Sequence, residues 1–249
     1  VINVIIDGIA TEVEKGTTIL HAANNIGITI PTLCNHEGLN LDGNCRLCSV
    51  EIDDRGRKKI VAACMFPVTA PITVDTKSER VMRARKTVLQ LLINRNPKAP
   101  IIRQLCKEYG VEYEERFASE SDLCIRCGRC VRACDINGTK AIELVGRGAE
   151  RHVAPPYELE PETCIGCLSC ASVCPTGKIT FEESEGVRKI WHRSFNLVQC
   201  KRCGEWYATT EMLDWAKVPV EEREVCDRCR KYKEGQKFLK MAGQKFAGS

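Results

Sequence analysis

The sequence lacks any apolar run long enough to cross a membrane, since no stretch approaches the roughly 18 apolar residues that a span requires. It also lacks an export signal at its start, because VINVIIDGIATEVEKG has no basic segment and polar residues such as Asn3 and Asp7 break its apolar run. These absences predict a cytoplasmic protein with no direct membrane span. The formal net charge of +4 on 249 residues is too small to require an acidic partner.

The usual signatures of substrate chemistry are missing as well. The sequence has no nucleophile–base set, no phosphate-cradling glycine loop and no flavin fingerprint, and GRGAE at residues 146–150 is too short for a dinucleotide turn. No base-reading helix or aromatic-rich basic face is evident, which argues against a nucleic-acid partner. No substrate-converting active site is therefore expected on this chain.

Cysteine, by contrast, is abundant, with 17 residues in the chain. A reducing compartment does not sustain so many disulfides, so the paired Cys-x-x-Cys spacings point to metal. All but Cys106 fall into groups of four, which is the number of ligands that iron–sulfur clusters and structural zinc both take. The groups are Cys34, Cys45, Cys48 and Cys64; Cys124, Cys127, Cys130 and Cys134; Cys164, Cys167, Cys170 and Cys174; and Cys200, Cys203, Cys226 and Cys229.

Residues 1–77 are predicted to form a small β-grasp domain. VINVII and IATEVE flank Asp7-Gly8, a strong signal for a two-residue hairpin. Thr18, or the threonine before it, can cap a helix over ILHAANNIG, which Gly27 ends. CSVEID and ITVDT then supply two more strands, as in plant-type ferredoxins.

The cysteine spacing of this domain departs from the plant-type C-x4-C-x2-C pattern. Residues 1–77 instead resemble the [2Fe–2S] domain that opens the large iron–sulfur subunit of respiratory complex I. The resemblance rests on the cysteine spacing and on the segments IPTLCNHEGL, GNCRLCSVEI and AACMFPV. The same domain opens iron-only hydrogenases and the iron–sulfur subunit of NAD-linked nickel–iron hydrogenases. The resemblance implies a [2Fe–2S] cluster on Cys34, Cys45, Cys48 and Cys64, with a zinc site on the same fold as the alternative.

Residues 78–118 are expected to form a helical linker. VMRARKTVLQLL is typical of a basic amphipathic helix, with Val81 and Leu91 among its apolar contacts. In the resembled family a His and three Cys that hold a further [4Fe–4S] cluster follow this helix, but INRNPKAPIIRQLCKEYG offers no histidine and only Cys106. That cluster is therefore expected to be absent, and Cys106 is interpreted as a small buried apolar residue rather than a reactive thiol.

Residues 119–190 are predicted to form a two-[4Fe–4S] ferredoxin domain. CIRCGRCVRAC and CIGCLSCASVCP share the C-x2-C-x2-C-x3-C run, and they resemble bacterial two-cluster ferredoxins. In such modules the fourth cysteine of each run crosses over to the other cluster, which implies two ligand sets. Cluster A would take Cys124, Cys127, Cys130 and Cys174, and cluster B would take Cys164, Cys167, Cys170 and Cys134.

The arginines of the first run have two interpretations. The favoured one is a solvated basic face formed by Arg126, Arg129 and Arg132. The other is that their charge raises the potential of the cluster or docks an acidic partner.

Residues 191–249 are expected to form a zinc-ribbon-like tail. CKRCGEWY and CDRC supply two Cys-x-x-Cys knuckles, separated by a short helix over TEMLDWA and a polar turn. Zinc on Cys200, Cys203, Cys226 and Cys229 is favoured over a further [4Fe–4S] cluster, because such clusters usually gather three ligands in one tight run. The expected cofactors of this α+β chain are therefore one [2Fe–2S], two [4Fe–4S] and one Zn²⁺.

A chain with these clusters in series is expected to conduct electrons as a subunit of a multi-subunit oxidoreductase. The resemblance implies an NAD(H)/FMN flavoprotein subunit, a thioredoxin-like [2Fe–2S] subunit and hydrogenase or formate dehydrogenase catalytic subunits as partners. It favours an NAD-linked nickel–iron hydrogenase, with flavin-based electron bifurcation as one form. Since residues 1–249 hold no H-cluster domain, the chain is not expected to be an iron-only hydrogenase.

Two alternatives remain open. The iron–sulfur subunit of fumarate reductase or succinate dehydrogenase also joins a [2Fe–2S] domain to a ferredoxin domain, but its first cysteines are closer together than Cys34 and Cys45. A redox-sensing regulatory protein is permitted by the basic tail, and it would require nucleic-acid binding by that tail.

Overall fold

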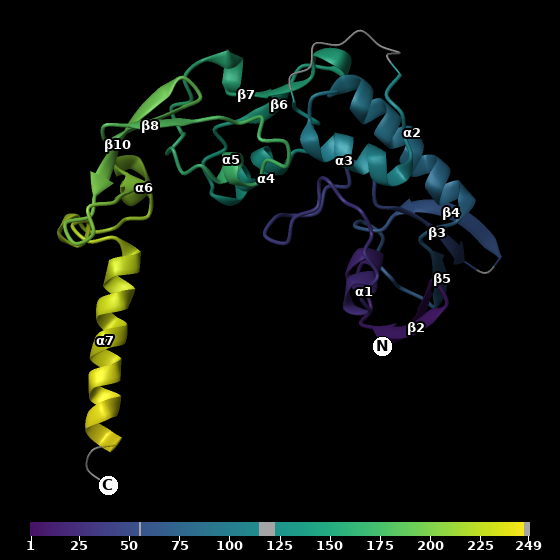
Figure 1. Ribbon diagram of the computed structural model, residues 1–249, viewed down its shortest axis with the longest axis horizontal. Coiled ribbons are helices and arrows are strands. Elements are labelled where there is room, and N and C mark those ends of the chain that lie inside the picture. The colour runs from purple at the N-terminus through teal and green to yellow at the C-terminus, as the bar shows by residue number, and fades with distance from the viewer. Residues whose placement is uncertain (55, 115–122, 247–249) are drawn as a thin grey trace.

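The chain traces an arch in the computed structural model, which describes residues 1–54, 56–114 and 123–246 (Figure 1). A sheet domain at the N-terminus forms one foot of the arch, and the central region lies at its crown. The last helix, α7 (Asp227–Phe246), projects from the other end. Within the described ranges, no helix combines the length and the apolar character needed to cross a bilayer.

Five strands form the N-terminal sheet, in the order β2-β1-β5-β3-β4. Their bounds are β1 (Ile2–Ile6), β2 (Ile9–Val13), β3 (Ser49–Asp54), β4 (Arg57–Ala62) and β5 (Ile72–Asp75). β1 and β5 run parallel, whereas the other neighbours run antiparallel. The hairpin predicted at Asp7-Gly8 is confirmed, because Ile6 pairs with Ile9 across it.

The predicted first helix is confirmed as α1 (Ile19–Asn25). The Thr18 side chain accepts a hydrogen bond from the His21 N–H at 3.3 Å, which satisfies one of the free donors at the helix start. α1 buries Ile19 fully in the core of the sheet domain. Burial of a side chain of this size contributes about 1.5–3 kcal/mol.

The linker consists of two packed helices, α2 (Glu79–Arg95) and α3 (Pro100–Tyr109). Leu89 and Ile93 are buried there, whereas Leu91 is 55% exposed, so the prediction for Leu91 was wrong. The buried stripe follows every fourth residue from Val81, a spacing that places these side chains on one side of the helix. The boundary predicted at residues 118 and 119 lies outside the described residues.

Short elements connect the cysteine runs at the crown. They are α4 (Arg129–Ile136), β6 (Glu143–Val145), η1 (Gly148–Glu150), β7 (His152–Ala154), η2 (Pro156–Glu158) and α5 (Ser169–Ser172). β6 lies within AIELVGRG and pairs with β7. α4 and α5 pack against each other, and each begins inside a cysteine run.

A four-stranded sheet follows, in the order β11-β10-β9-β8. The bounds of these last elements are β8 (Glu182–Ser184), β9 (Val187–Ile190), β10 (Arg193–Gln199), β11 (Trp206–Thr209), α6 (Thr210–Trp215) and η3 (Val220–Glu222). α6 confirms the helix predicted over TEMLDWA. The division predicted between residues 190 and 191 falls at the turn from β9 to β10, so a continuous sheet joins the two segments.

Candidate metal centres

The first group of cysteines gathers beside the N-terminal sheet. The Cys48 and Cys64 Sγ atoms are 3.4 Å apart, and the Cys45 N–H points at the Cys34 Sγ at 3.5 Å. Cys45 is partly exposed and the other three thiols are buried. The structure therefore brings together the four residues predicted to hold the [2Fe–2S] cluster, and their role as ligands stays a prediction.

Hydrogen bonds among these thiols favour the anionic form, which metal ligation requires, at Cys34 and Cys48. The thiols of Cys45 and Cys64 donate to Cys34 and hold its pKa far below the usual range. Cys64 likewise lowers the pKa of Cys48 to about 7. As donors, Cys45 and Cys64 have raised pKa values, so the group loses its protons in steps.

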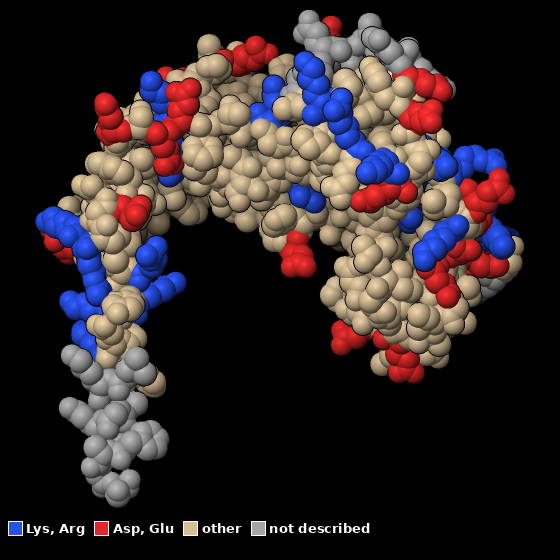
Figure 2. Space-filling view, in the orientation of Figure 1, with Lys and Arg blue, Asp and Glu red and all other residues tan. Residues whose placement is uncertain are grey.

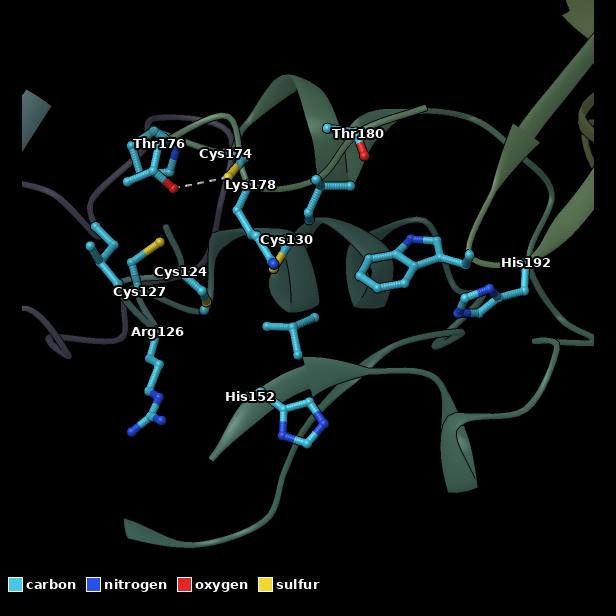
Figure 3. A pocket seen from close by; sticks show the side chains of 16 residues that line it. Cys124, Arg126, Cys127, Cys130, His152, Cys174, Thr176, Lys178, Thr180 and His192 are labelled. Atoms are coloured by element: carbon cyan, nitrogen blue, oxygen red, sulfur yellow. Dashed lines mark hydrogen bonds between the residues drawn. The ribbon is translucent and has the colours of Figure 1, made fainter. Parts of the chain in front are cut away.

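The cysteines of the second and third groups line two separate cavities, and the fourth cysteine of each group lies in the cavity of the other. Cys124, Cys127, Cys130 and Cys174 line a cavity of about 430 Å³, whose lining also includes His152, Lys178 and His192 (Figure 3). Cys134, Cys164, Cys167 and Cys170 line a much tighter cavity of about 20 Å³. Each cavity brings together the four cysteines expected to share a cluster, and their assignment as ligands stays a prediction.

Several donors surround the sulfurs expected for cluster B. Cys134 Sγ lies 3.1 Å from both the Ala141 N–H and the Thr139 hydroxyl. Asn137 Nδ2 donates to Cys167 Sγ at 3.3 Å. Hydrogen bonds of this kind stabilise extra negative charge on ligating sulfur, and so they adjust the potential of a bound cluster.

An arginine clamp, formed by Arg129 and Arg132 of α4, holds the cysteine loop of the N-terminal domain. Arg132 donates to the Cys34 carbonyl at 2.6 Å, and its Nη2 also reaches the Cys127 carbonyl at 3.4 Å. It also donates to the Asn40 carbonyl. Arg132 thus touches the backbone of a ligand candidate in each of two modules.

Further contacts close the same interface. Arg129 donates to the Asn35 carbonyl, and Asp42 lies 3.6 Å from the Arg132 guanidinium, whose side chain is only 13% exposed. At Gly128 an added Cβ would lie 3.0 Å from the Asp42 carboxylate. The favoured interpretation of Arg129 and Arg132 as a solvated face was therefore wrong, because both are committed to a contact that sequence spacing does not reveal.

The C-terminal sheet docks onto the loop of the third cysteine group. Arg188 donates to the Gly166 carbonyl at 2.6 Å, and Arg193 donates to the Cys164 carbonyl at 2.9 Å. The Thr209 hydroxyl donates to the Ile165 carbonyl at 2.6 Å while it also caps α6. These contacts cover the loop expected to hold cluster B, and sequence reasoning assigned none of them.

We expect Gly166→Ala to disturb this docking. Gly166 has φ +66°, and an added Cβ would lie 2.9 Å from the buried Phe195 ring. Gly177 has the same φ with nothing within 4 Å, so Gly177→Ala is the matched control. Backbone strain costs both variants about 1–2 kcal/mol, and overpacking should cost Gly166→Ala about 1–3 kcal/mol more. Equal thermal unfolding midpoints for the two variants would contradict this expectation.

The fourth group is compact. The Sγ atoms of Cys200, Cys203, Cys226 and Cys229 all lie within 4.8 Å of one another. The Cys226 N–H donates to Cys200 Sγ at 3.4 Å and lowers the pKa of Cys200 to about 6. Burial, by contrast, raises the pKa of Cys229 to about 12. The arrangement offers one ion four converging sulfurs.

Cys106 and two of the histidines make contacts outside the cysteine groups. Cys106 is buried between α2 and α3, where its Sγ lies 3.9 Å from the Leu89 carbonyl and burial raises its pKa. Its interpretation as a small buried residue is confirmed. His36 Nδ1 accepts from the Gly38 N–H, and His152 pairs with Glu158 at 3.0 Å.

Two known domain families match the sequence. The 2Fe-2S iron-sulfur cluster binding domain matches residues 1–79, and the 4Fe-4S dicluster domain matches residues 118–181. These matches define an iron–sulfur protein with a [2Fe–2S] domain and a [4Fe–4S] dicluster domain.

Two curated relatives show which iron–sulfur proteins this chain is similar to. The NADP-reducing hydrogenase subunit HndD of Solidesulfovibrio fructosivorans is 34% identical over 73% of this chain and 36% of its own length. The NADH-ubiquinone oxidoreductase 75 kDa subunit of Reclinomonas americana is 31% identical over 76% of this chain and 31% of its own length. The chain thus spans about a third of the length of these curated relatives.

A solved structure agrees with these relatives. A chain of the NAD⁺-reducing [NiFe]-hydrogenase in the H₂-reduced state aligns with a TM-score of 0.54 and 28% identity, covering 62% of this chain and 74% of that one. The protein therefore belongs to the iron–sulfur subunits related to NAD(P)-linked hydrogenases and complex I.

Proposed function

We propose that the chain is an electron-transfer subunit that carries electrons between an NAD(H)/FMN flavoprotein subunit and a catalytic partner such as a [NiFe] hydrogenase. Bound iron–sulfur clusters accept and release single electrons, and such partners supply the two-electron chemistry. The observation that carries the proposal is the arginine clamp, which joins the [2Fe–2S] loop directly to the first cysteine run. Modules held together in this way can exchange electrons without a diffusional encounter.

The proposed ligand sets follow the cavities. Cys34, Cys45, Cys48 and Cys64 would hold the [2Fe–2S] cluster, because their thiols converge and two of them have lowered pKa values. The cavity of about 430 Å³ supports cluster A, and the tighter cavity supports cluster B. The C-terminal sheet covers the cluster B loop, which leaves the wider cavity beside cluster A as the more open one.

Zinc is the proposed occupant of the fourth group. Four sulfurs at about 2.3 Å from a tetrahedral ion lie about 3.8 Å apart, and the Cys203 and Cys226 sulfurs are 3.9 Å apart. A [4Fe–4S] cube places iron and sulfide between its thiolates, which holds the thiolates further apart. The compact arrangement therefore favours a single ion, whose role would be to fold the C-terminal segment.

The names of the relatives support the choice of partners. They describe NADP-reducing hydrogenase, NADH-ubiquinone oxidoreductase and NAD⁺-reducing hydrogenase subunits. We therefore propose an NAD(P)-linked flavoprotein at one end and hydrogenase subunits at the other. A thioredoxin-like [2Fe–2S] subunit and flavin-based electron bifurcation are finer parts of the same proposal.

Metal analysis of the anaerobically purified chain, with EPR of the reduced sample, tests this function. About ten iron atoms and one zinc ion are expected per chain, with one [2Fe–2S] and two [4Fe–4S] signals. Stopped-flow mixing with NADH and a partner flavoprotein should then reduce the clusters. Low iron in a folded chain would overturn the proposal, and about fourteen iron atoms without zinc would make the fourth group another cluster.

A further inference from the structure

The turn between β9 and β10 has an unusual composition. Trp191 and His192 form a two-residue hairpin loop, because Ile190 pairs with Arg193 across it. Both residues have positive φ, +53° and +64°, which is the signature of a type I′ turn. Such turns usually contain glycine, asparagine or aspartate, because a side chain with a Cβ is strained in this conformation.

The neighbouring hairpin provides a comparison within the same sheet. The turn from β8 to β9 is Glu185-Gly186, again with positive φ at both positions, and there glycine occupies the second position. A tryptophan in the left-handed region is a conformational outlier. Backbone strain of this kind persists only where surrounding contacts impose it, and it gathers at functional sites. The contacts of Trp191 therefore identify what the strained turn achieves.

Trp191 lies between the two cluster cavities, because its side chain lines both of them. Its indole Nε1 is buried and makes no regular hydrogen bond with the described part of the protein. Cys170 lines the same tight cavity as Trp191, and Trp191 packs against the buried apolar cluster to which Cys170 belongs.

The other sulfurs of the tight cavity already have donors. Cys134 and Cys167 receive the hydrogen bonds described above, and the Gly166 N–H points at Cys164 Sγ at 3.5 Å. Cys170 is the remaining sulfur of this cavity, and the unpartnered Trp191 N–H, on the hairpin turn of the C-terminal sheet, is a donor beside the same cavity. A thiol is a weak acceptor, whereas a thiolate bound to iron carries the charge that attracts an N–H.

We propose that Trp191 tunes cluster B: its indole N–H donates to the Cys170 sulfur when the cluster is bound and thereby raises the reduction potential of that cluster. This inference rests on the proposed function, because it requires a cluster on Cys170. Reduction adds one electron to the cluster, and a donor to ligating sulfur stabilises the more negative, reduced form. The strained turn is what delivers the donor to this position.

Trp191→Phe tests the proposal, because phenylalanine keeps an aromatic ring and removes the N–H. Trp206→Phe is the matched control: Trp206 is 45% exposed on β11 and packs over Gly186 of the neighbouring turn. EPR-monitored redox titration of the full chain should show the reduction equilibrium of one [4Fe–4S] cluster falling about tenfold, which is about 59 mV for a one-electron couple. The other [4Fe–4S] cluster, the [2Fe–2S] cluster and the Trp206→Phe control should keep their potentials.

The outcomes separate this inference from the proposed function. An unchanged potential in a fully loaded Trp191→Phe protein, or an equal change in both [4Fe–4S] clusters, would overturn the role of Trp191 and leave the function standing. Absence of [4Fe–4S] signals from the unaltered protein would defeat both proposals. If Trp191→Phe does not assemble cluster B, the hydrogen bond is tested instead in the unaltered protein labelled with ¹⁵N-indole tryptophan, by measuring the ¹⁵N hyperfine coupling in the EPR of the reduced clusters. A ¹⁵N coupling to a reduced [4Fe–4S] cluster that is retained in both Trp206→Phe and Trp215→Phe supports the hydrogen bond. Its absence, or its loss in Trp215→Phe, overturns it.

Discussion

Cys226→Ser should release the zinc ion proposed for the fourth cysteine group and unfold the segment around it, while the iron content stays at about ten atoms per chain. The physical reason is the small size of the apolar cluster there. It consists of Cys200, Cys226 and Cys229, with Tyr207 and Val225 packed against it. Structural zinc supplies about 10–16 kcal/mol in comparable small sites, so we expect the fold of this segment to depend on the proposed ion.

The unfolding should stop at the C-terminal sheet. Arg188, Arg193 and Phe195 anchor β9 and β10 to the loop expected to hold cluster B. Hydrogen exchange should therefore increase over residues 200–205 and 223–246 and stay slow in β9, β10 and β11. Cys106→Ala is the control, since Cys106 belongs to no group of four and that variant should keep its zinc. A loss of about four iron atoms instead of zinc would show that the fourth group holds a cluster.

Cys48→Ser should abolish the [2Fe–2S] EPR signal and leave both [4Fe–4S] signals in place. The N-terminal domain has its own buried core, which includes Val4, Ile6 and Ile52, so loss of its cluster should not propagate through packing. Iron content should fall from about ten to about eight atoms per chain. EPR and metal analysis of the variant beside Cys106→Ala measure both changes.

Loss of all three signals together would contradict that expectation. It would mean that the modules cannot fold independently, and the arginine clamp would be the structural cause. Arg132 connects the backbone of Cys34 to that of Cys127, and Arg129 binds the Asn35 carbonyl, so disorder in the first loop would reach the second through these two side chains. Hydrogen exchange in α4 would show whether that route operates.

Local signals in the sequence predicted much of the N-terminal domain. Asp7-Gly8 identified the first hairpin, Thr18 the start of α1, and the cysteine runs identified the residues that line each cavity. These features depend on residues close together in the chain. The same is true of α6, whose cap is Thr209.

Other elements were missed because their local sequence hides the usual pattern, and one contact was missed because its partners are distant in the chain. β4 has the sequence RKKIVA, whose basic start hides the strand pattern, and α3 begins at a proline after a polar stretch. The hairpin of β9 and β10 escaped prediction because Trp191-His192 carries none of the usual turn residues. Arg129 and Arg132 were assigned to solvent because their acceptors lie more than ninety residues away in the sequence.

The acceptors in the arginine clamp are mainly carbonyl groups of the main chain, at Cys34, Asn35 and Asn40. Every amino acid supplies such a carbonyl, so the bonds survive when the side chains around them change. Positions 35 and 40 should accordingly tolerate substitution, whereas positions 129 and 132 should not. On the N-terminal side, the contact made by the arginine clamp therefore depends mainly on main-chain atoms. Selection on the sequence of this contact should act chiefly on Arg129 and Arg132.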